Sequence, residues 1–192
     1  EGVMTGSAAM NPDLSQFFFD VGVPLYDVYG MTETSPGISL NCPEGHRAGS
    51  VGRVMKGVLV VIDRSVVEPD ANDGEIVVYG PNVMRGYHRK PQATAAVMTA
   101  DGGLRTGDRG RLDADGYLFI TGRIKDQFKL ENGKYVFPAA IEEVLELHPL
   151  VLNSMVFGEG RAACVALVVL EPAAAKKWAE ANPGADVKET VS

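Results

Sequence analysis

The chain has 192 residues, of which 45% are hydrophobic and 22% charged, and its formal net charge is −7 at pH 7. This composition is ordinary for a globular protein. The acidic balance, without a run of lysine or arginine, argues against a nucleic-acid partner and against electrostatic docking on a membrane. We recognise no signal peptide and no apolar span of about 20 residues, so we expect a cytoplasmic protein, with peripheral membrane contact left open.

The first predicted elements form a strand–loop–helix–strand segment. Residues 24–30 (PLYDVYG) read as a short buried strand, and the loop TGSAAM occupies residues 5–10. Between them, residues 12–22 carry four apolar side chains at helical spacing: Leu14, Phe17, Phe18 and Val21. The order predicts the edge of an open α/β sheet, in which ligands bind beyond the carboxyl ends of the strands.

The strand at residues 24–30 opens into a tight polar loop, YGMTETSP, at residues 29–36. Mg²⁺ bound to phosphates takes only one or two protein carboxylates, so Glu33 is chemically sufficient as a metal ligand. Thr32 can donate its hydroxyl to a phosphate oxygen, Gly30 permits close backbone approach, and Tyr29 can lie against a purine. The alternative is an ordinary turn that binds nothing.

Short strands separated by glycine-rich turns are predicted in the middle of the chain, at residues 57–63, 75–80 and 116–121. Residues 91–98 are predicted to form a short helix. A small, distorted β-barrel or sheet is the natural packing for such strands.

A second unit is predicted to begin near residues 122–125. Residues 126–137 contain Asn-Gly between β-formers, which indicates a hairpin. Pro138 then opens a helix, and further strands and a helix follow at residues 152–158, 162–170 and 172–184. Residues 162–170 are apolar throughout, which predicts a central strand with a buried Cys164. Cys42 and Cys164 have neither metal-ligand spacing nor a disulfide framework.

Six segments together resemble the adenylate-forming enzymes: acyl-CoA synthetases, nonribosomal-peptide adenylation domains and beetle luciferases. In order they are TGSAAM (5–10), YGMTETSP (29–36), GSVGR (49–53), GEIVVYGPNVMRGY (74–87), RTGD (105–108) and GRIKDQFKLENGKYVFPAAIEE (122–143). The resemblance covers nearly all of residues 5–170. Each motif alone is weak, but six in the same order make chance agreement improbable.

The resemblance implies an α/β fold combined with α+β. Residues 1–122 would be the C-terminal part of the large N-terminal domain, with an α/β edge at 1–40 and a β-barrel-like subdomain at 41–122. Residues 123–192 would be an incomplete α+β lid domain. The family's phosphate loop and its late adenylation lysine have no counterpart here, so we expect a fragment that is inactive alone.

Nucleotide-binding roles also follow from the resemblance. Thr32 and Glu33 would hold phosphate and Mg²⁺, while Asp108 and Arg123 would hold the ribose. A carboxylate accepts both ribose hydroxyls, and the planar guanidinium fits hydroxyls and phosphate alike. The residues expected around the adenine are Ser7, Ala8, Ala9 and Tyr29, and Gly30 and Met31 are also expected to contact the nucleotide. For Asp108, the alternative is an Asx turn that caps its own backbone.

In the lid, Lys125 falls at the family's hinge position, where a few backbone torsions can rotate the domain between two half-reactions. Lys129 resembles the lysine on the face presented during the second half-reaction. Gly133 resembles the glycine beside the pantetheine tunnel, where the absence of a Cβ lets a thin chain pass. The alternatives are solvated surface lysines and a glycine required by its turn.

The function implied is an ATP-dependent carboxylate–CoA ligase that acts on a fatty acid, with long-chain substrates preferred by analogy. Its cofactors and co-substrates would be ATP, Mg²⁺ and coenzyme A. Two other functions stay open: a ligase that loads a carrier protein through an acyl-AMP, and a non-catalytic nucleotide-binding module.

Overall fold

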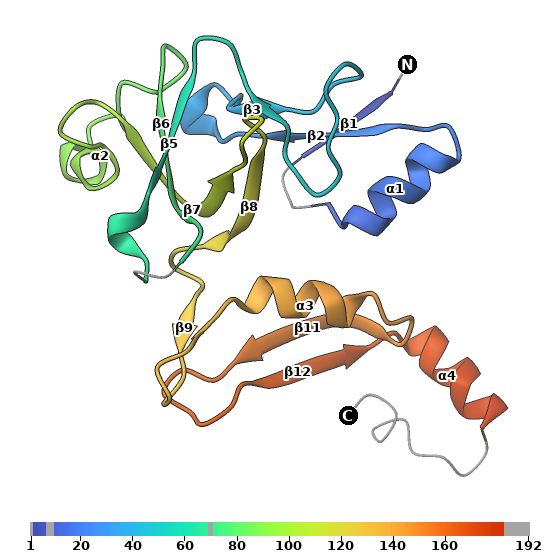
Figure 1. The fold of residues 1–192 in the computed structure, drawn as a ribbon. Helices are drawn as coiled ribbons and strands as arrows, with labels where there is room; N and C mark the ends of the chain where they lie inside the picture. Colours follow the sequence, from blue (N-terminus) through green and yellow to red (C-terminus); the bar gives the residue numbers. More distant parts are fainter. Residues whose placement is uncertain (1, 7–9, 69–70, 183–192) are drawn as a thin grey trace. The chain divides into compact units, whose positions relative to one another are not determined.

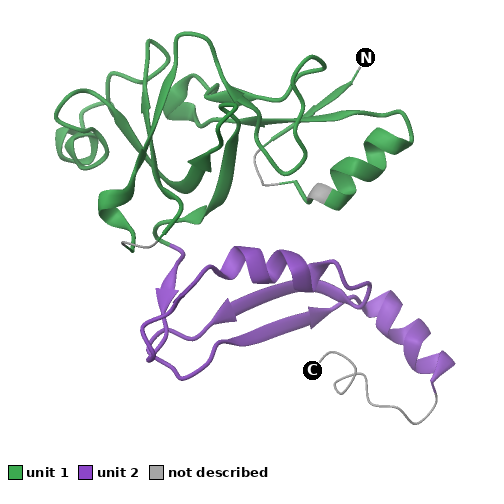
Figure 2. Cartoon of the chain, viewed as in Figure 1, with its two compact units in different colours: residues 1–125 green, residues 126–192 purple. Residues whose placement is uncertain are grey.

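The computed structural model describes residues 2–6, 10–68 and 71–182. The chain forms two compact units, residues 1–125 and residues 126–192 (Figure 2). The structure divides the chain after Lys125, within the range 122–125 near which the sequence predicted the boundary. Arg123 lies in the first unit.

The first unit begins with a four-stranded sheet that has the order β1-β2-β3-β4 (Figure 1). Its strands are β1 (Val3–Thr5), β2 (Leu25–Tyr29), β3 (Ser39–Leu40) and β4 (Arg53–Val54). β1 and β2 are parallel and are joined by helix α1 (Pro12–Asp20), which confirms the predicted strand–helix–strand edge. The other pairs are antiparallel.

Helix α1 begins at a side-chain cap, because Oδ1 of Asn11 accepts hydrogen bonds from the backbone N–H groups of Asp13 and Leu14. The apolar residues with helical spacing are not buried together. Ser15 is buried and Phe18 half-buried, while Leu14, Phe17 and Val21 are about half exposed. The helix turns Ser15 inward, so helical spacing located the helix but not the face that is buried.

A second antiparallel sheet has the order β5-β6-β7-β8. Its strands are β5 (Leu59–Asp63), β6 (Gly74–Tyr79), β7 (Leu104–Leu112) and β8 (Leu118–Arg123). The short helices are η1 (Thr32–Thr34), η2 (Arg64–Val66) and α2 (Pro91–Val97). The buried core consists of Ile38, Val60, Ile76, Val78 and Leu118.

The two sheets of the first unit are joined through the backbone beside β4. The N–H of Val51 donates to the carbonyl of Leu118, and the N–H of Leu118 donates to the carbonyl of Gly52. The expected β-rich subdomain is thus built from two joined sheets, which do not close into a barrel among the described strands. Ile38 and Leu118 bring the two sheets into one hydrophobic core.

The second unit contains two small antiparallel pairs and two helices. Its elements are β9 (Phe128–Lys129), β10 (Tyr135–Val136), α3 (Pro138–Glu146), β11 (Val151–Phe157), β12 (Val165–Leu170) and α4 (Pro172–Ala181). β9 pairs with β10, which confirms the hairpin predicted around Asn-Gly. β11 pairs with β12, and α3 packs against β11.

One expectation about the second unit was wrong, and another stays a prediction. Within the described residues β12 pairs only with β11, so the second neighbour of a central strand is not seen among them. Cys164 is exposed rather than buried. A run of apolar residues is typical of a central strand, but it also occurs in a strand with a single partner. The sequence does not distinguish these two cases.

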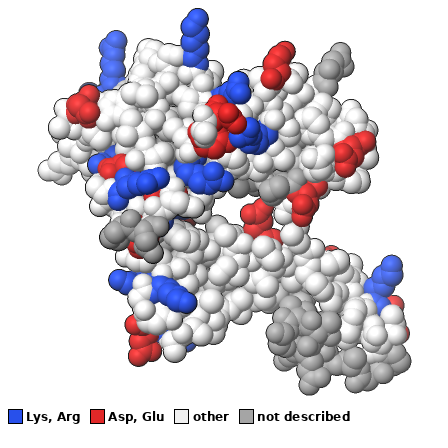
Figure 3. Space-filling view, in the orientation of Figure 1, with Lys and Arg blue, Asp and Glu red and all other residues white. Residues whose placement is uncertain are grey.

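In the described part of the chain, no helix combines the length and the apolar character needed to cross a bilayer. On the face drawn in Figure 3, acidic and basic side chains are interspersed, and no broad basic surface is visible.

Candidate functional site

The loop after β2 is fixed by its own hydrogen bonds. Residues 32–34 form the helical turn η1, and the buried Thr34 hydroxyl accepts from the N–H of Met31 at 3.1 Å and donates to the Met31 carbonyl at 3.0 Å. Gly30 is required by close packing, since a Cβ there would lie 1.3 Å from the carbonyl oxygen of Pro36. Thr32 is exposed and Glu33 half-buried. The loop therefore presents both side chains from a rigid turn.

The hydroxyl of Tyr29, at the end of β2, donates to Oδ2 of Asp108 at 2.6 Å. Burial raises the pKa of Tyr29, and the neighbouring Asp108 charge adds to this effect, so the hydroxyl stays a donor at neutral pH. Nε of Arg123 donates to the other carboxylate oxygen of Asp108 at 3.1 Å. The structure thus brings together three of the residues predicted to contact the nucleotide.

Asp108 lies within β7 at a β-bulge. Arg105 pairs with Val77 of β6 and Arg109 pairs with Glu75, so β7 has two more residues than β6 across this stretch. Gly107, in the bulge, has φ +73°, a left-handed conformation that favours glycine. The bulge leaves Asp108 without a register partner on β6, while Asp108 still pairs with Arg123 of β8.

Glu75 supports this bulge from the neighbouring strand. It is 7% exposed, and its Oε1 accepts a hydrogen bond from the N–H of Gly107 at 3.2 Å. Its Oε2 accepts from Arg105 at 2.5 Å, and Arg105 also pairs with Asp63 at 2.9 Å. These carboxylates raise the pKa of Arg105. The buried Glu75 carboxylate thus provides the acceptor for the Gly107 N–H within the bulge.

The segment after β6 holds the loop that carries Glu33. The hydroxyl of Tyr87 donates to Oε1 of Glu33 at 2.8 Å, and the N–H of Met84 donates to the Glu33 carbonyl at 2.8 Å. Nδ2 of Asn82 donates to the carbonyl of Gly37 at 2.7 Å. Residues 82–87 therefore fix the backbone of the loop and one oxygen of the Glu33 carboxylate.

Sequence reasoning missed Glu75, Asn82 and Tyr87 as residues that support the site. All three lie in GEIVVYGPNVMRGY, which was used only to recognise the family. A buried acid at the start of a strand was the one signal that could have identified Glu75, because an acid in a strand core needs a partner.

No group of three or more His, Cys, Asp or Glu side chains that could hold a metal ion exists in the described ranges. The donor set available is the single carboxylate of Glu33, whose Oε2 has no protein partner among those residues. One carboxylate fits Mg²⁺ only if nucleotide phosphates and water complete the octahedron. The residues present are therefore compatible with a metal that arrives with its nucleotide.

The remaining predicted residues are dispersed or not described. Ser7, Ala8 and Ala9 lie outside the described residues, so their expected contact with adenine is untested. Lys125 ends the first unit. In the second unit, Lys129 is exposed with its ammonium 5.2 Å from the ring centroid of Tyr135. Gly133 has φ +84° in the turn between β9 and β10, so its turn favours glycine in any case.

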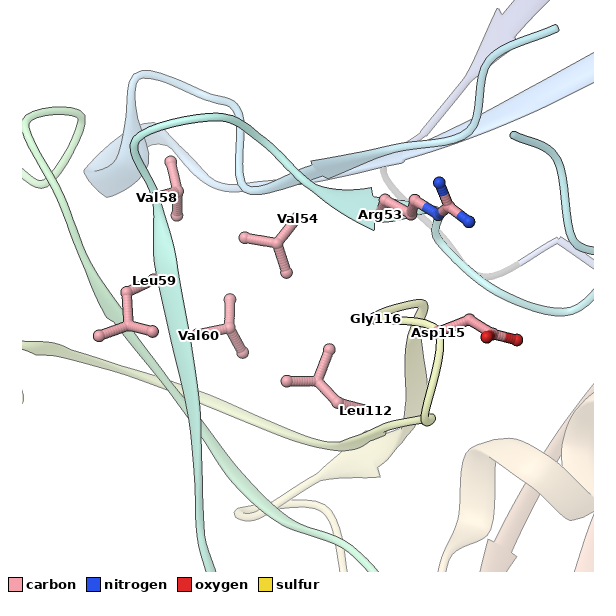
Figure 4. Close-up of a pocket in the computed structure, with 8 residues that line it drawn as sticks. All are labelled: Arg53, Val54, Val58, Leu59, Val60, Leu112, Asp115 and Gly116. Carbon is pink, nitrogen blue, oxygen red and sulfur yellow. The ribbon is translucent and has the colours of Figure 1, made fainter. Parts of the chain in front are cut away.

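A separate hollow of about 370 Å³ lies on the first unit (Figure 4). Arg53 and Asp115 are at one end, and the rest of its lining is Val54, Val58, Leu59, Val60, Leu112 and Gly116. It is a shallow, mainly apolar depression whose lining includes none of the predicted nucleotide ligands. We assign it no role.

Comparison with known proteins identifies the family. A family model described as AMP-binding enzyme matches residues 1–88, and one described as AMP-binding enzyme C-terminal domain matches residues 125–191. The chain belongs to the AMP-binding enzyme family. This confirms the resemblance read from the six ordered motifs.

Two curated relatives of the chain are named as long-chain-fatty-acid–CoA ligases. The long-chain-fatty-acid–CoA ligase FadD15 of Mycobacterium bovis is 36% identical over 179 residues, which are 93% of this chain and 28% of the relative. The long-chain-fatty-acid–CoA ligase ACSBG1 of Bos taurus is 37% identical over 158 residues, which are 81% and 21% of the two chains. The chain thus spans less than a third of either relative.

Solved structures of AMP-binding enzymes share its fold. O-succinylbenzoate coenzyme A synthetase (MenE) of Bacillus subtilis, in complex with ATP and magnesium ion, is 34% identical with a TM-score of 0.77, and the match covers 89% of this chain and 37% of MenE. ATP-bound MatB of Rhodopseudomonas palustris is also 34% identical, with a TM-score of 0.74 over 88% of this chain and 35% of MatB.

Proposed function

We propose that this chain forms the C-terminal part of an ATP-dependent ligase that joins a carboxylate, by preference a long-chain fatty acid, to coenzyme A. The reaction has two steps. The carboxylate attacks the α-phosphorus of ATP, a bond to pyrophosphate breaks, and an acyl-AMP forms. The CoA thiol then attacks the acyl carbon and displaces AMP, which leaves the thioester.

The observation that carries this proposal is the hydrogen bond between Tyr29 and Asp108. It ties the strand that leads into the Glu33 loop to the bulge in β7, although 79 residues separate the two partners. The carboxylate proposed to bind ribose and the loop proposed to bind phosphate must be held at a fixed distance from each other, because one nucleotide has to contact both at the same time. Names of relatives as CoA ligases support the same reaction.

Each residue has a distinct part in the proposed chemistry. Asp108 accepts hydrogen bonds from the ribose hydroxyls, and Arg123, whose side chain is 69% exposed, can reach ribose or phosphate while it pairs with Asp108. Thr32 donates to a phosphate oxygen from its exposed position on η1. Glu33 would hold Mg²⁺, which when bound neutralises the negative charge of the phosphates.

The other predicted residues are proposed to position the substrates. Tyr29, Gly30 and Met31 border the purine together with residues 7–9, and the fixed loop aims its donors before the substrate arrives. In the second unit, Lys129 and Gly133 act in thioester formation after the lid turns about Lys125. Such two-position lids let one enzyme perform two different half-reactions.

The test compares this chain with the longest natural polypeptide that contains it. We expect ATP–pyrophosphate exchange with a fatty acid in the longer polypeptide and none from the 192 residues alone. A panel of carboxylates of increasing length defines the acyl substrate, since the structural neighbour MenE is named for another carboxylate, O-succinylbenzoate. ATP–pyrophosphate exchange by the 192-residue chain would contradict the proposal that these residues alone are inactive.

The acceptor is tested separately by measuring thioester on free coenzyme A and on a phosphopantetheinyl carrier protein. We expect the free CoA thioester. Transfer to the carrier alone would assign the protein to carrier loading. Binding of AMP and ATP without turnover by the longer polypeptide would instead indicate a nucleotide-binding module.

A further inference from the structure

The carboxylate of Glu33 is held on one side only. Its Oε1 accepts the hydrogen bond from Tyr87 at 2.8 Å, while Oε2 has no protein donor among the residues that the structure describes. Both side chains are half-buried. The arrangement leaves one oxygen fixed and the other open.

Tyr87 is itself anchored by the start of helix α2. Its backbone N–H donates to Oγ1 of Thr94 at 2.9 Å, and that hydroxyl donates to the carbonyl of Lys90 at 3.0 Å. The turn is tight, because a Cβ on Gly86 would lie 2.7 Å from a methyl carbon of Thr94. Helix α2 thus holds the backbone of Tyr87 in place, independently of Glu33.

The segment of residues 82–87 also holds the main chain of Glu33, because the N–H of Met84 donates a hydrogen bond to the Glu33 carbonyl. With its backbone and one carboxylate oxygen both fixed, the side chain of Glu33 has few rotamers left. A partner that orients a metal-binding carboxylate commonly contributes a factor of 10–100 to metal affinity. This is the contribution expected from a tyrosine hydroxyl in this position.

We propose that Tyr87 is a positioning residue, which orients the carboxylate of Glu33 so that its free oxygen faces the Mg²⁺ of a bound nucleotide. The inference rests on the proposed function. Tyr87 touches neither substrate nor metal and acts only through Glu33. It therefore strengthens the coupling between metal and nucleotide without contributing to nucleotide binding in the absence of metal.

The test measures ATP affinity by calorimetry in the longest natural polypeptide that contains this sequence. The Kd for ATP is determined in EDTA and again with saturating Mg²⁺. The ratio of the EDTA value to the Mg²⁺ value measures how much the metal strengthens ATP binding. Tyr87→Phe is expected to lower this ratio about 10-fold. The Kd for AMP in EDTA is expected to stay the same, which a general loss of structure would not allow.

Two further variants frame the result. Tyr79→Phe is the matched control, because it also removes a tyrosine–carboxylate hydrogen bond, from Tyr79 to Asp101, in the same unit. It is expected to leave the ratio unchanged. Glu33→Gln is expected to lower the ratio at least as far as Tyr87→Phe, since it removes the proposed metal ligand.

The possible outcomes distinguish a failure of the inference about Tyr87 from a failure of the proposed function. Wild-type protein that binds no nucleotide overturns the proposed function. A normal ratio in Glu33→Gln removes the metal role of Glu33 and the inference with it. If Glu33→Gln lowers the ratio but Tyr87→Phe leaves it unchanged or raises it, the hydroxyl is neutral or competes with the metal, and the inference alone is overturned.

Discussion

The phenolic oxygen of Tyr29 lies 2.6 Å from Oδ2 of Asp108, and through this contact the last residue of β2 is joined to the bulge of β7. Asp108 is only 8% exposed. A buried carboxylate relies on such donors, because water reaches it poorly. The pair therefore serves the fold and the proposed ribose site at once.

Tyr29→Phe removes only the hydroxyl and is expected to lower the free energy of unfolding by about 1.5–3 kcal/mol, the range for hydrogen bonds to charged groups. Urea unfolding measures this loss. Tyr79→Phe is the control, because its partner Asp101 is exposed and the expected loss is smaller. Equal losses in the two variants would contradict a special role for the buried pair.

Glu75 is predicted to hold the bulge through both its charge and its acceptor oxygen. Glu75→Ala leaves Arg105 without one of its partners and the Gly107 N–H without an acceptor, at a cost of about 3 kcal/mol. Glu75→Gln keeps an acceptor and is expected to cost about half as much. Urea unfolding gives both values, and the NMR shift of the Gly107 amide reports whether the bulge persists. An unshifted amide in Glu75→Ala would show that the bulge does not depend on Glu75.

Asp27 is predicted to make stability depend on pH. Burial raises the pKa of its carboxyl from 3.8 to about 6. The folded chain therefore retains a proton that the unfolded chain releases, and the contribution of Asp27 to the free energy of unfolding falls as pH rises from about 4 to about 6. Asp27→Asn removes this contribution and should stabilise the protein near neutral pH by about 1–2 kcal/mol after solvent screening.

Urea unfolding across this pH range, for wild type and Asp27→Asn, checks the prediction. The difference between the two curves is what matters, because burial lowers the pKa of His46 and gives a slope of the opposite sign. A constant difference between wild type and variant at all pH values would mean that Asp27 does not titrate in this window.

Gly30 is predicted to tolerate no side chain. A Cβ would meet the Pro36 carbonyl at 1.3 Å, which is backbone and cannot rotate away, so Gly30→Ala should distort the loop that presents Glu33. Gly45→Ala is the matched control, since its Cβ would find only ordinary contacts, beginning at 3.4 Å from the Tyr117 hydroxyl. We expect thermal unfolding to place Gly30→Ala well below wild type and Gly45→Ala close to it. Similar melting temperatures for the two variants would contradict the steric argument.

Much of the fold could be predicted from local signals. The helix at residues 12–20, the turn after Tyr29, and the hairpin around Gly133 each depend on residues a few positions apart. Helical spacing, tight turns and Asn-Gly act at that range. The six motifs in order also led to the family, because motif order is a property of the sequence itself.

Local pattern failed where burial depends on distant partners. Leu14 and Phe17 have helical spacing but are exposed, and the apolar strand β12 has a single partner in the described chain. Amphipathic pattern shows that a segment can bury a face. Which face is buried depends on what packs against it, and that is decided by the rest of the fold.

The sequence by itself determined the secondary structure, the family and the identities of the candidate ligands, since each of these depends on residues that are close together in the sequence. Tertiary structure alone decided how the ligands are held. Tyr29 reaches Asp108 across 79 residues, and Tyr87 reaches Glu33 across 54. Pairings at such separations depend on sheet register and on one β-bulge, and a shift of one residue turns a strand's side chains to the opposite face.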